Sequence, residues 1–236
     1  MDDDHPIRFA EAYPFARPAS CFLFRDGGIH PLPPGWRDGD RTPVVAIGAN
    51  AAPRRLAQKF IGPHEAIPVT RARLHDHAVV FSAHYSSYGA LPATVWPADG
   101  ALTEVFVTWL DPDQLERMHR SEGVGRRYRL VMLEGVELRT AGHEGIERAE
   151  AYVSEAGALA PDGAPIRLAE LPAIGCRFEA SSQPAMLKRV WRLLAPDEPY
   201  AVVMARVVSS PSLRETLRDR LARFALPSAL PRARSG

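Results

Sequence analysis

Apolar and polar positions along the chain predict a large β-sheet followed by helices. Residues 43–47 (PVVAI) form an apolar run that is typical of a buried strand. Runs rich in β-branched and aromatic residues, separated by turn residues, predict further strands at 77–82, 92–97, 103–110, 128–133, 136–140 and 146–154. One helix is expected among them at 52–62, where Leu56 and Phe60 lie one turn apart and Gly62 provides the stop. Strands first and helices afterwards predict an α+β domain.

Beyond about Ala156 the apolar residues recur at helical spacing. One set follows serine caps and consists of Met186, Leu187, Val190, Trp191 and Leu194. A second set follows Ser212 and Glu215 and consists of Leu213, Leu217, Leu221 and Phe224. Residues 199–208 (PYAVVMARVV) fit either a strand or a helix, and both interpretations stay open. We therefore expect C-terminal helices in addition to the sheet.

The two ends of the chain differ in composition from its middle. Residues 1–40 are rich in proline and glycine, and within them 20–32 (SCFLFRDGGIHPL) predict a hairpin that turns at Asp26, Gly27 and Gly28. Residues 227–236 hold too few apolar side chains to pack and are expected to be mobile. The predicted organisation is an accessory N-terminal extension at 1–40, one domain at 41–226 and a tail at 227–236.

The stretch 110–128 (LDPDQLERMHRSEGVGRRY) predicts a helix whose phase is fixed by its ends. The signals are Asp111 as a cap, Pro112 at the first helical position, Gln114 in a capping box and Gly123 as the stop. Leu115, Met118 and Glu122 then share one inward face. A buried carboxylate is costly unless it is paired, and such groups serve general acid–base chemistry. The alternative is a frayed last turn in which Glu122 points into water.

Composition and charge exclude several classes of protein. The chain has 236 residues, 46% of them hydrophobic, and a net charge of +1, so no nucleic-acid partner is expected. Its two cysteines, Cys21 and Cys176, fit no metal or redox spacing and indicate thiols in a reducing compartment. The acidic start lacks an apolar signal region, and no run approaches 18 uninterrupted apolar residues. We expect a cytoplasmic protein without a membrane partner.

Familiar catalytic motifs are missing: there is no common phosphate-binding glycine loop, no G-x-S-x-G elbow and no H-E-x-x-H. His75 and His77 fall on one face of a predicted strand and could share a metal, but no third ligand is near in sequence. Hydrogen-bonded histidines at a strand edge are the alternative, and no metal site is predicted. Ser86, Ser87 and Cys21 could act as nucleophiles only beside a base in space.

A better candidate is the loop of residues 47–50 (IGAN), between a buried strand and a helix. Gly48 lets the backbone approach a ligand closely. Free N–H groups near the start of the helix favour a negative charge or a developing oxyanion. The alternative is an ordinary turn in which Asn50 helps to cap the helix.

Five segments resemble the gamma-glutamylcyclotransferase-like family in order and spacing. They are IGAN, ARLHDHAVVFS, YGALPATVWPADGALTEVFVTWL, LERMHRSEGVGRRY and AEAYV, and they span about Pro43 to Val153. The resemblance implies a small mixed β-barrel with flanking helices. It also implies that Glu122 is the catalytic general acid/base, and that Tyr128 and Tyr152 match two tyrosines of the family.

In the loop, the resemblance matches Gly48 and Asn50 to two of the family's four positions. Ile47 and Ala49 stand where the family has a tyrosine and a serine, so two hydroxyl groups are missing. Backbone donors at Ala49, Asn50 and Ala51 do not depend on side chains and would remain. These five residues, with Tyr128 and Tyr152, are the predicted substrate-binding residues.

The activity that the resemblance implies is intramolecular cleavage of a γ-glutamyl amide or a related small amide. The products are 5-oxoproline and an amine. No metal or organic cofactor is required, because nucleophile and electrophile belong to one small-molecule substrate. The rival interpretation is a non-catalytic module that binds a small molecule on the same fold, which the changes at Ile47 and Ala49 favour.

Overall fold

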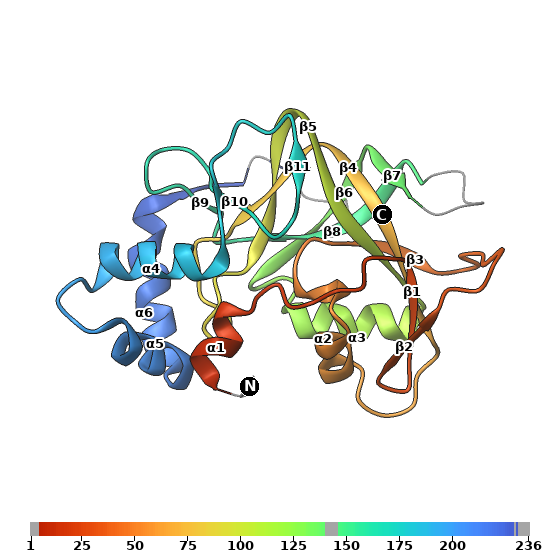
Figure 1. Cartoon of the computed structure of the whole chain (residues 1–236), viewed down its shortest axis with the longest axis horizontal. Helices are drawn as coiled ribbons and strands as arrows, with labels where there is room; N and C mark the ends of the chain where they lie inside the picture. The colour runs from red at the N-terminus through yellow and green to blue at the C-terminus, as the bar shows by residue number, and fades with distance from the viewer. Residues whose placement is uncertain (1–4, 140–145, 229, 231–236) are drawn as a thin grey trace.

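A mixed β-sheet forms the centre of the computed structural model, which describes residues 5–139, 146–228 and 230 (Figure 1). Its longest strands, β4 (Ile67–Phe81) and β5 (Ala93–Leu110), pair antiparallel. Strand β3 (Thr42–Ala46) pairs antiparallel with β5, β8 (Arg148–Ser154) pairs parallel with β3, and β6 (Tyr128–Glu134) pairs antiparallel with β8. Together with the helices, this sheet confirms the predicted α+β class.

Short strands complete the sheet, which has eleven strands in the described residues. They are β1 (Phe22–Arg25), β2 (Gly28–Pro31), β7 (Val136–Leu138), β10 (Arg167–Leu168), β11 (Ala173–Ile174) and β12 (Ala180–Ser181). Strands β1 and β2 form the expected hairpin, and β1 also pairs with β4. A separate two-stranded sheet joins β9 (Ala158–Leu159) to β13 (Ala225–Leu226).

The predicted closed barrel is not formed in the described residues. The hydrogen-bonded order runs β12-β10-β4-β5-β3-β8-β6, so β6 is the last strand of this series. Beyond β6 the chain turns at Gly135, with φ +71°, into β7, which pairs with β4. This left-handed residue interrupts the strand. The β6 edge of the sheet is therefore connected to β4 by the chain that leads into β7, and not by an unbroken ladder of hydrogen bonds.

The strands predicted at 92–97 and 103–110 are one strand, β5. The strand predicted at 77–82 is the last part of the longer strand β4. The register of β4 against β5 shifts between His75 and His77, where Asp76 has φ +55°. Opposite it, the N–H of Gly100 donates to Asp76 Oδ1 over 2.8 Å. A β-bulge thus absorbs the turn-type residues that the sequence analysis expects to separate two strands.

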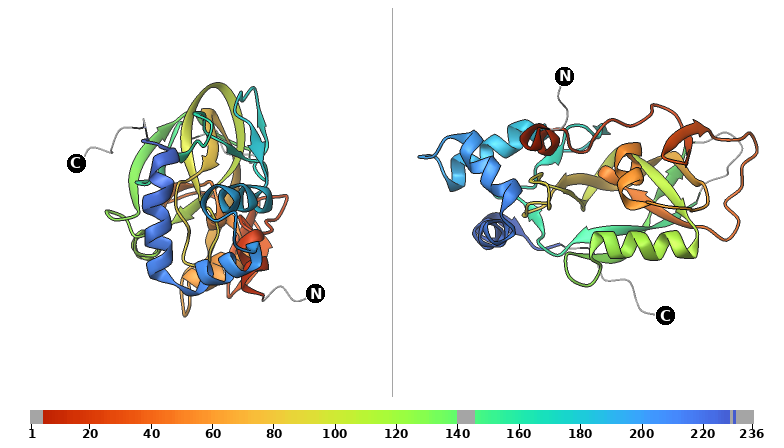
Figure 2. Two further views of the ribbon diagram at one scale, coloured as in Figure 1. Left: turned by 90° about the vertical axis from the view of Figure 1, so that its left-hand side faces the viewer. Right: turned by 90° about the horizontal axis from the view of Figure 1, so that it is seen from below.

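The helices form two groups that lie apart along the long axis of the molecule (Figures 1 and 2). One group is α2 (Pro53–Lys59), after the 3₁₀ turn η1 (Ala49–Ala51), and α3 (Pro112–Glu122). The other is α1 (Pro6–Glu11), α4 (Gln183–Leu194), α5 (Tyr200–Ser209) and α6 (Pro211–Leu221), followed by η2 (Ala222–Phe224). Segment 199–208 is therefore helical, and Ser210, not Ser212, caps α6. No helix in the described ranges is long and apolar enough to cross a bilayer.

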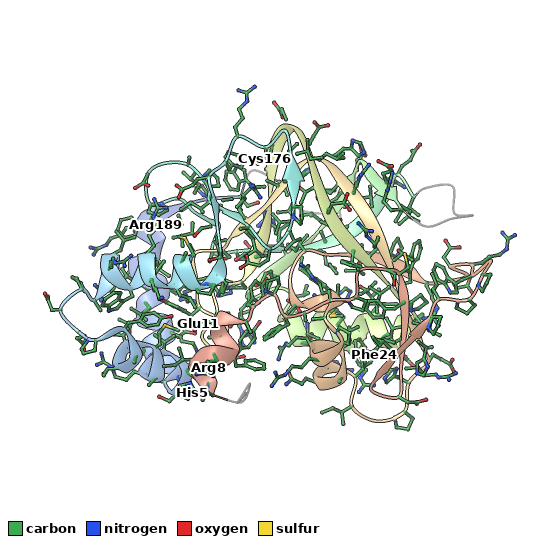
Figure 3. All side chains as sticks on the ribbon, in the orientation of Figure 1. His5, Arg8, Glu11, Phe24, Cys176 and Arg189 are labelled. Carbon is green, nitrogen blue, oxygen red and sulfur yellow. The ribbon has the colours of Figure 1, made fainter. Side chains whose placement is uncertain are left out.

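Residues 5–40, here called the N-terminal segment, run from the C-terminal group of helices to the other side of the sheet. Helix α1 packs against α4 and α5, and the chain then crosses the molecule to β1 and β2 (Figure 1). Tyr200 Oη on α5 donates to Glu11 Oε1 over 2.9 Å, and Figure 3 labels Glu11 on α1. Tyr13, Phe15 and Phe24 are buried. The segment thus contributes to the core, while the domain boundary at residue 40 stays a prediction. The predicted tail, 227–236, lies largely outside the described residues.

Candidate active site

One pocket gathers almost all the residues that the sequence analysis assigns to a site. Its lining includes Ile47, Gly48, Ala49, Asn50, Glu122, Tyr128 and Tyr152. Ala51 is fully buried and does not line the pocket. The cavity has a volume of about 100 Å³. A cavity of this volume can admit a small molecule.

Helix α3 places Glu122 as its phase predicts. Asp111 Oδ1 accepts from the Gln114 N–H (2.8 Å), Gln114 Oε1 accepts from the Asp111 N–H (3.1 Å), and Gly123 ends the helix with φ +67°. Met118 is fully buried one turn before Glu122, and the Glu122 side chain is only 15% exposed. The last turn is thus ordered, and its carboxylate faces the pocket.

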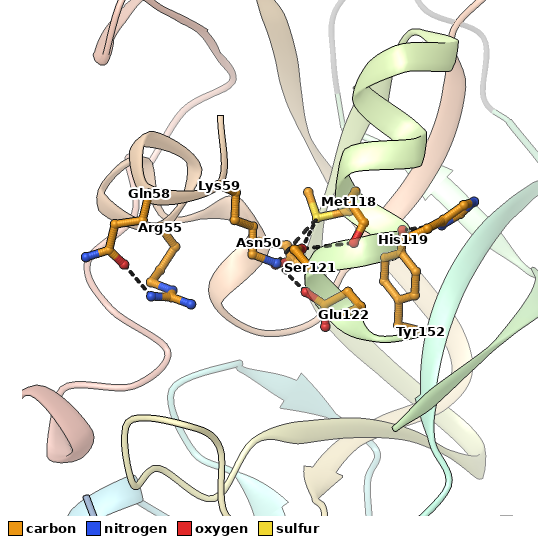
Figure 4. Close-up of polar contacts among 9 residues, drawn as sticks. All are labelled: Asn50, Arg55, Gln58, Lys59, Met118, His119, Ser121, Glu122 and Tyr152. Atoms are coloured by element: carbon orange, nitrogen blue, oxygen red, sulfur yellow. Dashed lines mark hydrogen bonds and ion pairs between the residues drawn. The ribbon is translucent and has the colours of Figure 1, made fainter. Parts of the chain in front are cut away.

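The buried carboxylate is paired with Lys59 of α2. Lys59 Nζ contacts Glu122 Oε1, lies 2.7 Å from Asn50 Oδ1 and lies 3.4 Å from Met118 Sδ (Figure 4). Its side chain is 9% exposed. Burial lowers the pKa of Lys59 below its ordinary value, while the charge of Glu122 opposes that shift. One ammonium group thus ties the 47–50 loop to the end of α3.

Lys59 is a site residue that the sequence analysis misses. A signal was present, because Lys59 follows the inward Leu56 by three residues and precedes the inward Phe60. A lysine at the last turn of a helix also has an ordinary explanation in the helix dipole. The sequence therefore offered no reason to connect it with Glu122.

Tyr13 explains why residue 48 is glycine. An added Cβ at Gly48 would collide with the Tyr13 hydroxyl oxygen. The sequence analysis expects a ligand to approach Gly48 closely, and in the structure this tyrosine is a group of the protein that does so. Tyr13 lines the pocket although it lies 35 residues before Gly48, in the segment treated as an accessory.

The other pocket tyrosines are buried or half-buried phenols. Burial, with the charge of Glu122 next, raises the pKa of Tyr128 and of Tyr152 above the ordinary value. Burial likewise raises the pKa of Tyr88 to about 12. The Tyr152 hydroxyl lies 2.9 Å from His119 Nδ1 on α3 (Figure 4). These hydroxyl groups stay protonated at neutral pH and can donate hydrogen bonds.

Basic side chains outnumber acidic ones around the pocket. Arg55, Lys59 and Arg127 line it, whereas Glu122 is the one acidic side chain in its lining among the described residues. The Arg55 guanidinium lies over the Tyr88 ring, 4.7 Å from its centroid. A surplus of positive charge favours a ligand that carries a negative group.

His84 adds a neutral ring to the pocket. It is 8% exposed, and its Nδ1 lies 2.8 Å from Ser82 Oγ. Burial, reinforced by the charges of Arg127 and Arg218, lowers the pKa of His84 to about 4. The ring is therefore uncharged at neutral pH.

Stability should depend on pH through His84. The unfolded chain binds a proton on His84 below about pH 6.5, and the folded protein does so only near pH 4. Between these values the unfolded state holds more protons, so the free energy of unfolding falls as the pH falls. Urea unfolding at pH 7 and pH 4.5 should show wild type losing about 2 kcal/mol more than His84→Gln.

The matched control for that comparison is His30→Gln, which changes an exposed histidine. It should lose as much stability between the two pH values as wild type does. Equal losses in wild type and His84→Gln would contradict the role of His84.

The remaining candidates do not form a second site. Ser86 and Ser87 line the same pocket, while Cys21 lies outside its lining and its Sγ accepts from the Arg71 N–H. His75 Nε2 lies 3.1 Å from Glu137 Oε2, and His77 Nδ1 lies 2.8 Å from the His75 carbonyl oxygen. In the part of the chain that is described, no group of three or more His, Cys, Asp or Glu side chains could hold a metal ion.

Comparison with known proteins finds similar solved structures only. No protein-family model matches the chain, and no curated protein matches it. A gamma-glutamyl cyclotransferase is 14% identical, over 83% of this chain and 94% of that one, with a TM-score of 0.41. An uncharacterized human protein is 14% identical over the same shares, with a TM-score of 0.40. A yeast gamma-glutamyl cyclotransferase specific to glutathione is 12% identical, over 79% of this chain and 98% of that one, with a TM-score of 0.33. Similarities at this level assign no function to the chain.

Proposed function

We propose that the protein cleaves a γ-glutamyl amide, or a related small amide, by attack of the substrate's own amine. The observation that carries this proposal is the carboxylate of Glu122. One oxygen is anchored by Lys59, whereas Oε2 has no hydrogen-bond partner in the described part of the chain. A buried carboxylate that is fixed on one side and free on the other, beside a small cavity, is suited to proton transfer.

The chemistry needs one group that both accepts and returns a proton. Glu122 takes a proton from the α-ammonium of the substrate, and the freed amine attacks the γ-carbonyl carbon. The bond to the leaving nitrogen then breaks, and the carboxyl of Glu122 protonates that nitrogen. The ring nitrogen gives up two protons in all, and the departing amine takes both. The products are 5-oxoproline and an ammonium, and no water is consumed.

The charges that line the pocket support a substrate of this kind. The α-carboxylate of a γ-glutamyl compound matches the basic surplus of Arg55, Lys59 and Arg127. The γ-carbonyl oxygen would face the backbone of residues 48–51, where negative charge develops during attack. The attacking amine and the carbonyl belong to one molecule, so proximity supplies much of the acceleration without a cofactor.

The test is release of 5-oxoproline from a panel of γ-glutamyl dipeptides and γ-glutamyl amines. The proposal expects turnover of at least one member, measured by chromatography of the product. Calorimetry with the same panel addresses the rival. If a ligand binds without release of 5-oxoproline, the protein is a binding module and the proposed reaction is wrong.

A further inference from the structure

The N-terminal segment delivers a hydroxyl group to the Glu122 pocket. Tyr13 is 4% exposed and lines the cavity. Its Oη accepts a hydrogen bond from the Ala93 N–H over 2.8 Å, and an added Cβ on Gly48 would meet this oxygen. The hydroxyl is therefore held between the start of β5 and the 47–50 loop.

The proton of this hydroxyl has no acceptor among the described residues. Burial raises the pKa of Tyr13 above its ordinary value, so the phenol keeps its proton at neutral pH. Buried tyrosine hydroxyls nearly always find a hydrogen-bond partner. The Ala93 amide uses an oxygen lone pair and leaves the O–H free to donate. The open space beside the group is the cavity, so an acceptor for this proton has to come from what fills the cavity, water or a ligand.

Aromatic packing holds Tyr13 in this place. Its ring lies 6.3 Å from the Phe15 ring at an interplanar angle of 76°. Phe15 in turn lies 5.8 Å from Tyr88, over which the Arg55 guanidinium stacks. The hydroxyl is thus preorganised by neighbours and does not have to be recruited when a ligand arrives.

The neighbouring 47–50 loop needs a hydroxyl group from elsewhere, because its own side chains carry none. Ile47 and Ala49 are apolar, and Asn50 uses its Oδ1 to accept from Lys59, so none of these side chains offers a hydroxyl group. We propose that Tyr13 is a substrate-binding residue whose O–H donates to the carbonyl oxygen of the scissile amide, beside the backbone of residues 48–51. This inference rests on the proposed function, since it assigns a donor to the oxygen that becomes negative there.

Tyr13→Phe tests this role by removing the hydroxyl and keeping the ring. Loss of one donor to a developing oxyanion lowers kcat by about 10²-fold. We expect that fall in 5-oxoproline release, with KM changed less than kcat. The matched control is Tyr200→Phe, which removes the hydroxyl bonded to Glu11 but lies outside the pocket lining. It should lower the melting temperature and leave kcat within twofold of wild type.

A second pair of variants tests the contact with Gly48. Gly48→Ala alone should displace Tyr13, because the new Cβ collides with the hydroxyl oxygen. In the Tyr13→Phe background that oxygen is gone, and the nearest ring atom is 3.1 Å from the Cβ position. The drop in melting temperature caused by Gly48→Ala should therefore be smaller in the Tyr13→Phe protein.

The possible outcomes separate this inference from the proposed function. Unchanged kcat and KM in Tyr13→Phe would show that the tyrosine only packs. If wild type releases no 5-oxoproline, the proposed reaction is wrong, and calorimetry with γ-glutamylalanine decides the role of Tyr13. A tenfold weaker Kd in Tyr13→Phe would support the hydrogen bond, and an equal Kd, or no binding by wild type, would overturn it.

Discussion

Glu122→Gln is expected to lower the rate of 5-oxoproline release by about 10²- to 10⁴-fold, the usual contribution of general acid–base catalysis. Glutamine keeps the size of the side chain and can still accept from Lys59, but it cannot take a proton from the substrate. The measurement is steady-state release of 5-oxoproline by the wild type and the variant. A variant with near-normal turnover would contradict the assignment of Glu122.

The structure changes what this substitution should do to stability. From the sequence alone, loss of a costly buried carboxylate predicts an unchanged or higher melting temperature. In the structure the carboxylate is the counter-charge of Lys59, whose side chain is 9% exposed. Glu122→Gln therefore leaves a buried ammonium without its partner, and a fall in the free energy of unfolding is expected. Activity and stability should fall together in this variant.

Lys59→Met is expected to lower the free energy of unfolding by about 3 to 5 kcal/mol, the range for removing one partner of a buried ion pair. Methionine has a similar length and is apolar, but it leaves the Glu122 carboxylate uncompensated and Asn50 Oδ1 without its donor. The measurement is urea unfolding at neutral pH. Lys188→Met is the matched control, because Lys188 is exposed on α4 and its replacement should change the free energy little.

The double variant Lys59→Met/Glu122→Gln separates the two roles of the pair. Neutral replacement of both partners removes the unpaired charge, so most of the lost stability should return. Turnover should stay as low as in Glu122→Gln, because the proton acceptor is still missing. A double variant that regains both stability and turnover would show that the pair supports the fold and not the chemistry.

Local signals decided which parts of this structure were predictable from sequence. The ends of α3 are marked by residues in the helix or directly beside it, Asp111, Gln114 and Gly123, so the direction of Glu122 followed from nearest-neighbour rules. Composition found most of the longer strands, but not their limits near Gly100, the first half of β4, or the short strands β10, β11 and β12 in a region where helical spacing was expected. A bulge joins Gly100 to Asp76, and such pairing depends on a partner strand.

Contacts between distant segments had no signal in the chain. Lys59 meets Glu122 across 63 positions, and Tyr13 meets Ala93 across 80. Each of these residues has an ordinary local explanation, as a helix-end lysine or as an aromatic in a proline-rich stretch. The expected closed barrel was wrong for the same reason. The strand is interrupted at Gly135, and this break depends on the pairing of β7 with β4, a contact between distant segments.

The bridge between α1 and α5 also orders events during synthesis. The bond from Tyr200 to Glu11 spans 189 positions, so α1 leaves the ribosome long before the helix on which it docks. Until α4 and α5 have emerged, α1 lacks the helices against which it packs, and the segment that carries Tyr13 is anchored by β1 on β4 and by the contacts of Tyr13 and Phe15 with Ala93 and Tyr88. The docking of α1 can thus be completed only after the C-terminal helices exist, which couples this end of the segment to late steps of folding.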